Sequence, residues 1–140
     1  MKALCILIGL VLIAGLSFSC REIQKTAGRQ RMVHDIPCQD LKTQIIDQLR
    51  ARKIPAEFRD EIKGLIEAGP FFDQPFPPDT YQKVEEKYQL EVTCLDELSS
   101  RITLKSRIRA QGEGNQWFEM TDPRKKELYE KRFLERLMIK

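Results

Sequence analysis

Apolar residues at helical spacing predict a helix that begins near residue 38. Its apolar positions are Cys38, Leu41, Ile45 and Leu49. Intervals of three or four residues place such positions on one face of a helix. Either Asp35 or Asp40 suits the N-terminal cap. The sequence therefore predicts a helix that buries one face.

The same period predicts two further helices. The apolar stripe of the first is formed by Phe58, Ile62, Leu65 and Ile66. Pro55 suits its first turn, and Gly69-Pro70 would end it. The short connection at residues 52–55 predicts that these first two helices form an antiparallel hairpin. A short third helix is predicted from Tyr81, Val84 and Tyr88, with a capping box at Asp79 and Gln82.

Residues 101–109 follow a different period, because apolar and charged side chains alternate there. Ile102, Leu104 and Ile108 fall on one face, and the other face carries Arg101, Thr103, Lys105, Arg107 and Arg109. This alternation predicts a half-buried strand. Turn-forming residues at 111–115 precede a predicted return strand at 116–120. Leu90, Val92 and Cys94 also alternate and predict a third short strand, although Thr93 could instead cap a helix.

The last helix begins at Asp122 and Pro123, and Tyr129, Phe133 and Leu137 give it an apolar face. These elements predict an α+β fold with a helical hairpin, a short helix, a small antiparallel β-hairpin or meander, and a C-terminal helix. An all-α bundle is the alternative. Residues 36–140 are enough for a single small globular domain.

The first nineteen residues have the composition of an export signal. Lys2 precedes an uncharged apolar stretch, and the small residues Ser17 and Ser19 lie just before Cys20. The segment resembles the signal peptide of bacterial lipoproteins. This resemblance implies that residues 1–19 are removed and that Cys20 carries the lipid (palmitate) anchor. Residues 20–35 contain few apolar side chains and are predicted to form a tether.

Two other processing routes also fit this leader. Ordinary signal cleavage requires small residues such as Ser17 and Ser19 and would give a secreted protein. An uncleaved anchor would span the membrane with residues 3–20, and the cations that follow would then hold the domain in the cytoplasm. The lipoprotein route predicts a location in the bacterial envelope, facing the periplasm or the exterior. Because Arg21 rather than aspartate follows Cys20, this route favours the outer membrane.

The cysteine count depends on the processing route. Cys5 leaves with the leader, and lipid on Cys20 leaves Cys38 and Cys94. An even pair in an oxidising compartment predicts one disulfide. The alternative is that both are buried thiols.

Charge and motifs argue against several classes of function. The formal net charge is +3 and falls to +2 when Lys2 is removed, and export also argues against nucleic-acid binding. The only histidine, His34, precedes Cys38 by four residues. These two residues are too few to form a zinc site, which needs three or four protein ligands. The neighbouring carboxylates are adjacent in sequence and therefore do not pair on a helix: Asp60-Glu61, Glu85-Glu86 and Asp96-Glu97. We expect no catalytic residue, metal or cofactor, because no phosphate loop, serine elbow or zinc motif occurs.

Two features predict binding. Phe71, Phe72 and Phe76 lie in a proline-rich loop, where they either present an apolar contact to a partner or cover the core. The basic strand face consists of Arg101, Lys105, Arg107 and Arg109. It either meets an anionic surface or keeps an exposed strand soluble.

The predicted function is that of a membrane-anchored accessory or assembly factor. In this hypothesis, the Phe/Pro loop or the last helix docks on an envelope protein. The alternative is a binder of anionic lipid or glycan through the basic strand face. A hydrolase of cell-wall or extracellular substrates ranks last, because no catalytic motif supports it.

Overall fold

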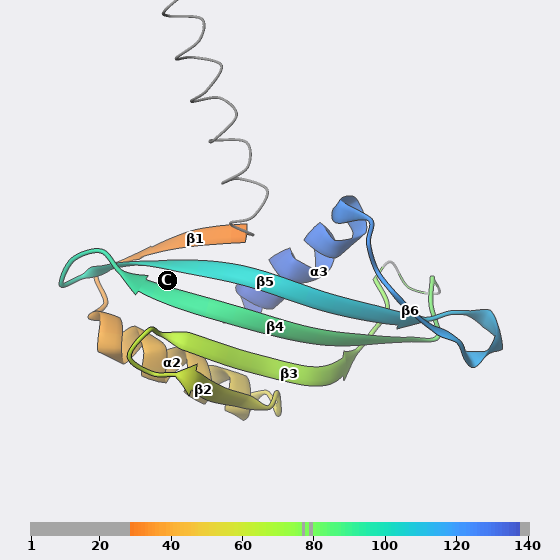
Figure 1. The fold of residues 1–140 in the computed structure, drawn as a ribbon, viewed down its shortest axis with the longest axis horizontal. Coiled ribbons are helices and arrows are strands. Elements are labelled where there is room, and N and C mark those ends of the chain that lie inside the picture. Colours follow the sequence, from red (N-terminus) through yellow and green to blue (C-terminus); the bar gives the residue numbers. More distant parts are fainter. Residues whose placement is uncertain (1–28, 77, 79, 138–140) are drawn as a thin grey trace, which may run out of the picture.

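A computed structural model describes residues 29–76, 78 and 80–137 of the chain. The predicted leader, Cys20, the first part of the predicted tether and Asp79 lie outside the described residues. The described part forms one antiparallel sheet with two helices on one of its faces (Figure 1). The strand order is β1-β5-β4-β3-β2, and β6 pairs with β5.

The elements follow one another with short connections. In chain order they are β1 (Arg29–His34), α2 (Cys38–Ala51), β2 (Ala56–Asp60), β3 (Leu65–Asp73), β4 (Lys83–Cys94), β5 (Ser99–Gln111), the short 3₁₀ helix η1 (Glu113–Asn115), β6 (Trp117–Glu119) and α3 (Pro123–Arg136). All paired strands are antiparallel. The long strands β4 and β5 form the centre of the sheet and carry most of its surface.

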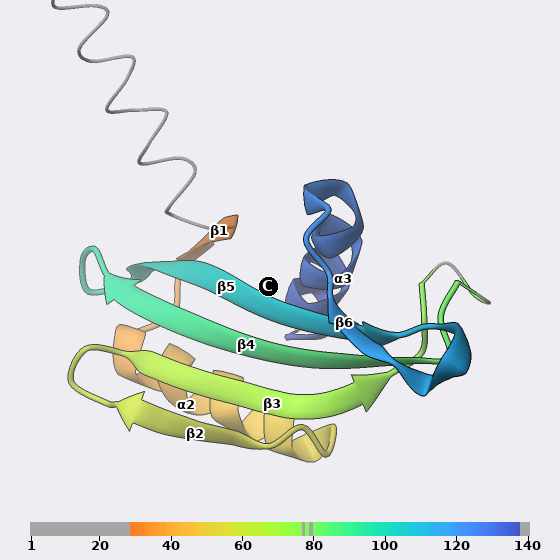
Figure 2. The same ribbon diagram turned by 45° about the vertical axis from the view of Figure 1, so that its right-hand side comes forward.

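The hydrophobic core lies between the sheet and the two helices, which share one side of it (Figures 1 and 2). The apolar face of α2 contributes Leu41, Ile45 and Leu49, and α3 contributes Phe133 and Leu134. The sheet contributes inward-facing residues from its central strands, namely Ile66, Ala68, Tyr88, Leu90, Val92, Ile102 and Leu104. Removing this apolar surface from water is the main stabilising term.

Several elements confirm the sequence pattern. The first and last helices are α2 and α3, and the alternating segments are β5, β6 and the second half of β4. Asp122 caps α3, because its side chain accepts a hydrogen bond of 2.9 Å from the N–H of Arg124. Neither Asp35 nor Asp40 caps α2, because Pro37 occupies the N-cap position and no side-chain cap bond forms there.

The predicted second helix is wrong, and with it the helical hairpin. Its residues form β2, a turn and the start of β3. Phe58 pairs with Ile66 across the two strands, and both face the helices, whereas Ile62 lies in the turn with 95% of its surface exposed. The spacing of Phe58 and Ile66 fits one face of a helix, but pairing of β2 with β3, and of β3 with β4, decides for strands.

The predicted third helix is also wrong, because Val84 and Tyr88 belong to β4 and Tyr81 lies just before that strand. Val84 and Tyr88 are four residues apart, a spacing that also fits two inward positions of a strand, and both are buried. The fold is therefore mostly β, with one six-stranded sheet and two helices among the described residues. It is neither the predicted α+β arrangement nor the all-α alternative.

The predicted tether at 20–35 ends too late, because residues 29–34 form β1. This strand pairs with the first half of β5, and Val33 is buried in the core. Arg29 forms an ion pair of 2.7 Å with Glu127, and Arg31 donates a hydrogen bond to the carbonyl of Leu134, both in the C-terminal helix α3. β1 therefore joins the edge of the sheet to α3 rather than linking two separate parts.

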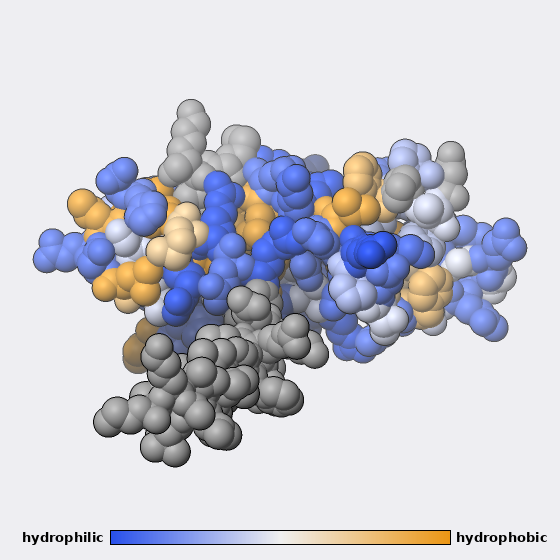
Figure 3. Space-filling view, turned by 90° about the horizontal axis from the view of Figure 1, so that it is seen from above, coloured by the Kyte–Doolittle hydropathy of each residue, from blue (hydrophilic) through white to orange (hydrophobic). Residues whose placement is uncertain are grey.

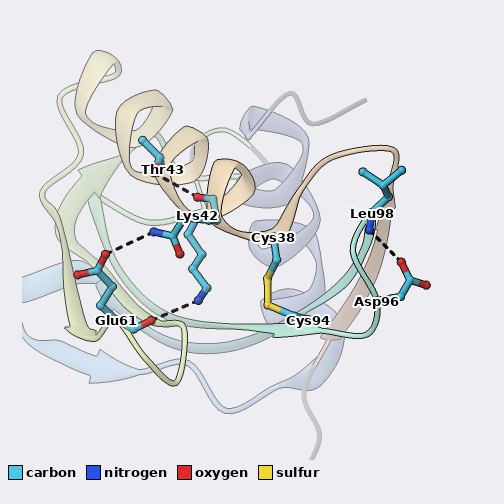
Figure 4. Close-up of a disulfide and its surroundings, with 8 residues drawn as sticks. Cys38, Lys42, Thr43, Glu61, Cys94, Asp96 and Leu98 are labelled. Atoms are coloured by element: carbon cyan, nitrogen blue, oxygen red, sulfur yellow. Dashed lines mark hydrogen bonds between the residues drawn. A yellow bond between two sulfur atoms is a disulfide. The ribbon is translucent and has the colours of Figure 1, made fainter.

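The predicted disulfide between Cys38 and Cys94 is present (Figure 4). It joins the first turn of α2 to the last residue of β4, and its Cα atoms are 5.7 Å apart. Beside it, the ammonium group of Lys42 donates a hydrogen bond of 3.3 Å to the carbonyl of Glu61 in the β2–β3 turn. The N-terminal part of α2 is thus attached to two hairpins of the sheet.

Gly64 allows the β2–β3 turn to pack closely on β4. Its φ is +69°, and a Cβ atom there would collide with the carbonyl oxygen of Val92. We expect Gly64→Ala to lower the free energy of unfolding by about 2 kcal/mol, because both the backbone angle and the contact disfavour a side chain. Urea denaturation measures this change. Ile62→Ala, in the same turn but fully exposed, is the control and should change stability by less than about 0.5 kcal/mol.

Neither α2 nor α3, the two α-helices of the described chain, has the length and apolar character that crossing a bilayer requires.

Candidate functional site

The face of the sheet away from the helices, here called the open face, carries no described helix (Figures 1 and 2). The alternation of β5 places Ile102, Leu104 and Ile108 inward, where they are buried. The basic side chains of the strand, Arg101, Lys105, Arg107 and Arg109, therefore lie on the open face. The sequence predicted this placement from the period alone.

Neighbouring strands neutralise part of this basic face. Arg109 lies 3.5 Å from Glu85 on β4, and Arg107 forms an ion pair of 2.6 Å with Glu119 on β6. Lys105 has no carboxylate within ion-pair distance among residues 29–76, 78 and 80–137. The open face therefore carries both signs of charge, with an excess of cations along β5. The sequence of β5 alone did not reveal the carboxylates that neighbouring strands contribute.

Aromatic side chains gather at one end of the open face. The ring centroids of Phe72, near the end of β3, and Trp117, on β6, are 6.1 Å apart. The guanidinium of Arg109 lies 5.4 Å from the centre of the Trp117 ring, a cation–π geometry. Phe72 keeps 66% of its surface exposed. We call Phe72, Arg109 and Trp117 the aromatic patch.

The structure separates the three phenylalanines that the sequence grouped. Phe71 belongs to the core, because its ring lies 6.3 Å from that of Phe133 and 6.2 Å from that of Tyr88. Phe72 lies on the open face. The backbone N–H of Phe76 donates a hydrogen bond of 2.8 Å to the Tyr129 hydroxyl. The loop therefore both covers the core and exposes an apolar side chain.

A buried acidic pair, Asp73 and Glu86, lies on the opposite side of the sheet beneath α3. Glu86 is 1% exposed, and its Oε1 accepts a hydrogen bond of 2.5 Å from the Tyr88 hydroxyl. Asp73 is held by two cations of α3, at 2.6 Å from Arg136 and 3.1 Å from Arg132. The sequence did not reveal this pair, although a glutamate at an inward position of β4 was the available signal.

The two carboxyl groups have opposite protonation tendencies. Burial raises the pKa of Glu86 to about 8, and the neighbouring Asp73 carboxylate adds to this effect. Burial alone would also raise the pKa of Asp73, but hydrogen bonds from Arg136 and from protonated Glu86 outweigh it and lower the pKa. At neutral pH, Glu86 therefore carries a proton and donates it in a hydrogen bond to ionised Asp73.

The positions considered for catalysis do not assemble into a reactive group. His34 is exposed, and its Nδ1 lies 3.3 Å from the Ser99 hydroxyl. Glu85 and Glu86 point to opposite faces of β4, and Glu86 is closed to solvent. Among the described residues, no group of three or more His, Cys, Asp or Glu side chains could hold a metal ion.

Comparison with known proteins gives little further guidance. No protein-family model and no curated protein matches the sequence. A solved structure of a DUF4468 family protein from Bacteroides ovatus ATCC 8483 is similar in part, with a TM-score of 0.42 and 15% sequence identity. The similarity covers 65% of this chain and 58% of that chain. At this level it supports no conclusion about function.

Proposed function

We propose that this chain is an exported, lipid-anchored protein of a bacterial envelope that docks on another envelope protein through the aromatic patch. The observation that carries the proposal is the exposed ring of Phe72 beside Trp117 and Arg109 on an uncovered sheet face. Phenylalanine, tryptophan and arginine are enriched at the centres of protein interfaces. The leader and Cys20 support the location, because they resemble a lipoprotein signal.

Another exposed apolar group fits a docking surface less well. Hydrophobic colour gathers at the end of the molecule that carries the β4–β5 turn (Figure 3), where Leu95 and Leu98 are exposed. The acidic residues Asp96 and Glu97 lie between these leucines, and leucine is under-represented among residues that dominate binding energy. The aromatic patch is therefore the better candidate for the centre of an interface.

The charges beside the aromatic patch indicate which surface chemistry a partner would need. Lys105 and Arg107 precede Arg109 along β5 and are exposed. A partner with an apolar pocket for Phe72 and acidic side chains at its rim would complement this arrangement. The last helix, which the sequence offered as a second docking element, buries Tyr129, Phe133 and Leu134 against the rest of the fold and exposes one large apolar side chain, Leu128, in its described part.

We expect Phe72→Ala to weaken partner binding at least about tenfold, because truncation empties the central pocket of the interface. Leu128→Ala removes another exposed apolar side chain, on α3, and should leave the affinity unchanged. Affinity is measured by biolayer interferometry with the partner recovered from envelope extracts. The affinity should fall only several-fold between about 0.05 and 0.5 M salt, because salt screens the charges at the rim but not the apolar contact of Phe72. Equal affinity of the Phe72→Ala variant, or a steep loss with salt, would instead favour a charged ligand on β5.

A further inference from the structure

The centre of the open face holds a shallow groove that is separate from the aromatic patch. Its charged lining comes from four strands: Arg59 of β2, Glu67 of β3, Lys87 of β4, and Lys105 and Arg107 of β5. Gln89, Tyr88 and Ser106 complete the lining. We call this surface the basic groove. It contains four cations and one carboxylate.

The register of the sheet places like charges together in the basic groove. Lys87 lies directly opposite Arg107 in the β4–β5 pairing. Like charges at opposite positions destabilise an antiparallel pair. Lys105 faces Gln89 and has no carboxylate within ion-pair distance in the described part of the chain. Glu67 and Glu119 relieve part of this cost at Lys87 and Arg107, but Lys105 remains unrelieved, and a local cost of this kind is typical of a functional surface.

Glu67 orients two of the cations without neutralising the groove. It lies 2.7 Å from the Lys87 ammonium and 3.0 Å from the Arg59 guanidinium. The hydrogen bond from Lys87 lowers the pKa of Glu67, so this carboxylate stays ionised. The fourth cation, Arg107, pairs with Glu119 outside the groove lining. The groove therefore keeps a positive charge that only an external anion can balance.

We infer that the basic groove binds a phosphate group, as a monoester or a diester. Lys87 of β4 and Lys105 and Arg107 of β5 line the same groove, and a phosphate offers more charge and more acceptor oxygens than a single carboxylate. The two lysine ammonium groups suit such an anion as point charges, Arg107 adds positive charge beside its ion pair with Glu119, and the Gln89 amide supplies a neutral donor. This inference goes beyond the proposed docking function and does not depend on the aromatic patch.

The test is a titration of the full chain, held in detergent micelles, with glycerol phosphate and with inorganic phosphate, followed by amide NMR shifts. We expect saturable shifts that include Lys87, Gln89 and Lys105. The double variant Lys105→Gln, Arg107→Gln should raise the dissociation constant at least about tenfold. Lys131→Gln removes an exposed cation from α3 and should change it less than about twofold. The melting temperature of the double variant, compared with that of the wild type, shows whether the fold is retained, and Lys105→Gln alone should also weaken phosphate binding.

The source of the phosphate is distinguished by vesicles. If vesicles containing phosphatidylglycerol bind the chain and the double variant weakens this binding, the phosphate belongs to a lipid headgroup. If only the soluble phosphates bind, it belongs to a soluble or polymer-borne ester. Absence of saturable shifts with either soluble phosphate, or equal weakening by Lys131→Gln, would overturn the inference. Phe72→Ala should leave phosphate binding intact, so the two proposals can fail separately.

Discussion

Replacing Cys38 and Cys94 together with alanine should lower the free energy of unfolding by about 4 kcal/mol. The disulfide joins residues 56 positions apart, and closing a loop of this length restricts the unfolded chain by about that amount. Domains of this size are stable by only about 5–15 kcal/mol in total. Urea denaturation of the oxidised wild type and of the double variant measures the difference from the two midpoints and slopes.

The control for this experiment is the wild type in a reducing agent, which should resemble the double variant. The reducing agent should not change the stability of the double variant itself. A reduced wild type as stable as the oxidised protein would show that the bridge contributes nothing. Such a result would mean that α2 is held to the sheet by the core alone.

Replacing Glu86 with glutamine should remove a large pH dependence of stability. The pKa of Glu86 is about 8 in the folded chain, against an ordinary value of 4.5. Between these values the folded chain holds a proton that the unfolded chain has released, so a rise in pH favours unfolding. The stabilising contribution is therefore complete below about pH 4.5 and is lost progressively up to about pH 8, by at most about 1.4 kcal/mol per pH unit.

The neutral amide of Glu86→Gln mimics the protonated acid and can still donate to Asp73. At about pH 8.5 we expect the variant to exceed the wild type by on the order of 3 kcal/mol, and near pH 5 the two should agree. Asp73, whose pKa is lowered, acts in the opposite direction and reduces the stability of both proteins in strong acid. Urea denaturation at a series of pH values measures these curves.

Glu85→Gln is the matched control for this prediction. Glu85 is the sequence neighbour of Glu86 but lies on the open face, where it contacts Arg109. Its replacement should leave the slope between about pH 5 and 8 as in the wild type. Identical slopes for the Glu86→Gln variant and the wild type would show that the buried carboxyl is ionised throughout this range.

The elements that the sequence predicted correctly have a period that only one structure satisfies. In β5, nine residues alternate almost without exception, and a helix would have mixed Arg101 and Lys105 with Ile102. In α3, Asp122-Pro123 marks a helix start, and the adjacent buried residues Phe133 and Leu134 would point to opposite faces of a strand. Local signals were sufficient there because they agreed with the final packing.

Where the prediction failed, spacing was ambiguous or a polar residue interrupted the strand pattern. Val84 and Tyr88 fit one face of a helix and one face of a strand equally well. Glu86 lies between them at an inward position, so the apolar alternation of β4 is broken at the residue that joins the buried acidic pair. In β2 and β3, partner strands decide the structure, and a single segment cannot reveal them.

The candidate binding surfaces were predictable only in part. The basic side chains of β5 were identified from their alternation, and Phe72 was named with Phe71 and Phe76 as either a partner contact or a cover of the core. The pairing of Phe72 with Trp117, and of Lys87 with Arg107, depends on the register of strands that are distant in sequence. The aromatic patch and the basic groove therefore become visible only in the folded sheet.

The most direct test of the proposed docking function is site-specific photocrosslinking in the cells that produce the protein. A photoreactive phenylalanine analogue replaces Phe72 on the open face or Leu128, the exposed control on α3. We expect one discrete adduct from position 72, lost when Trp117→Ala is added, and none from position 128. No adduct at position 72, or the same adduct from both positions, would contradict docking through the open face.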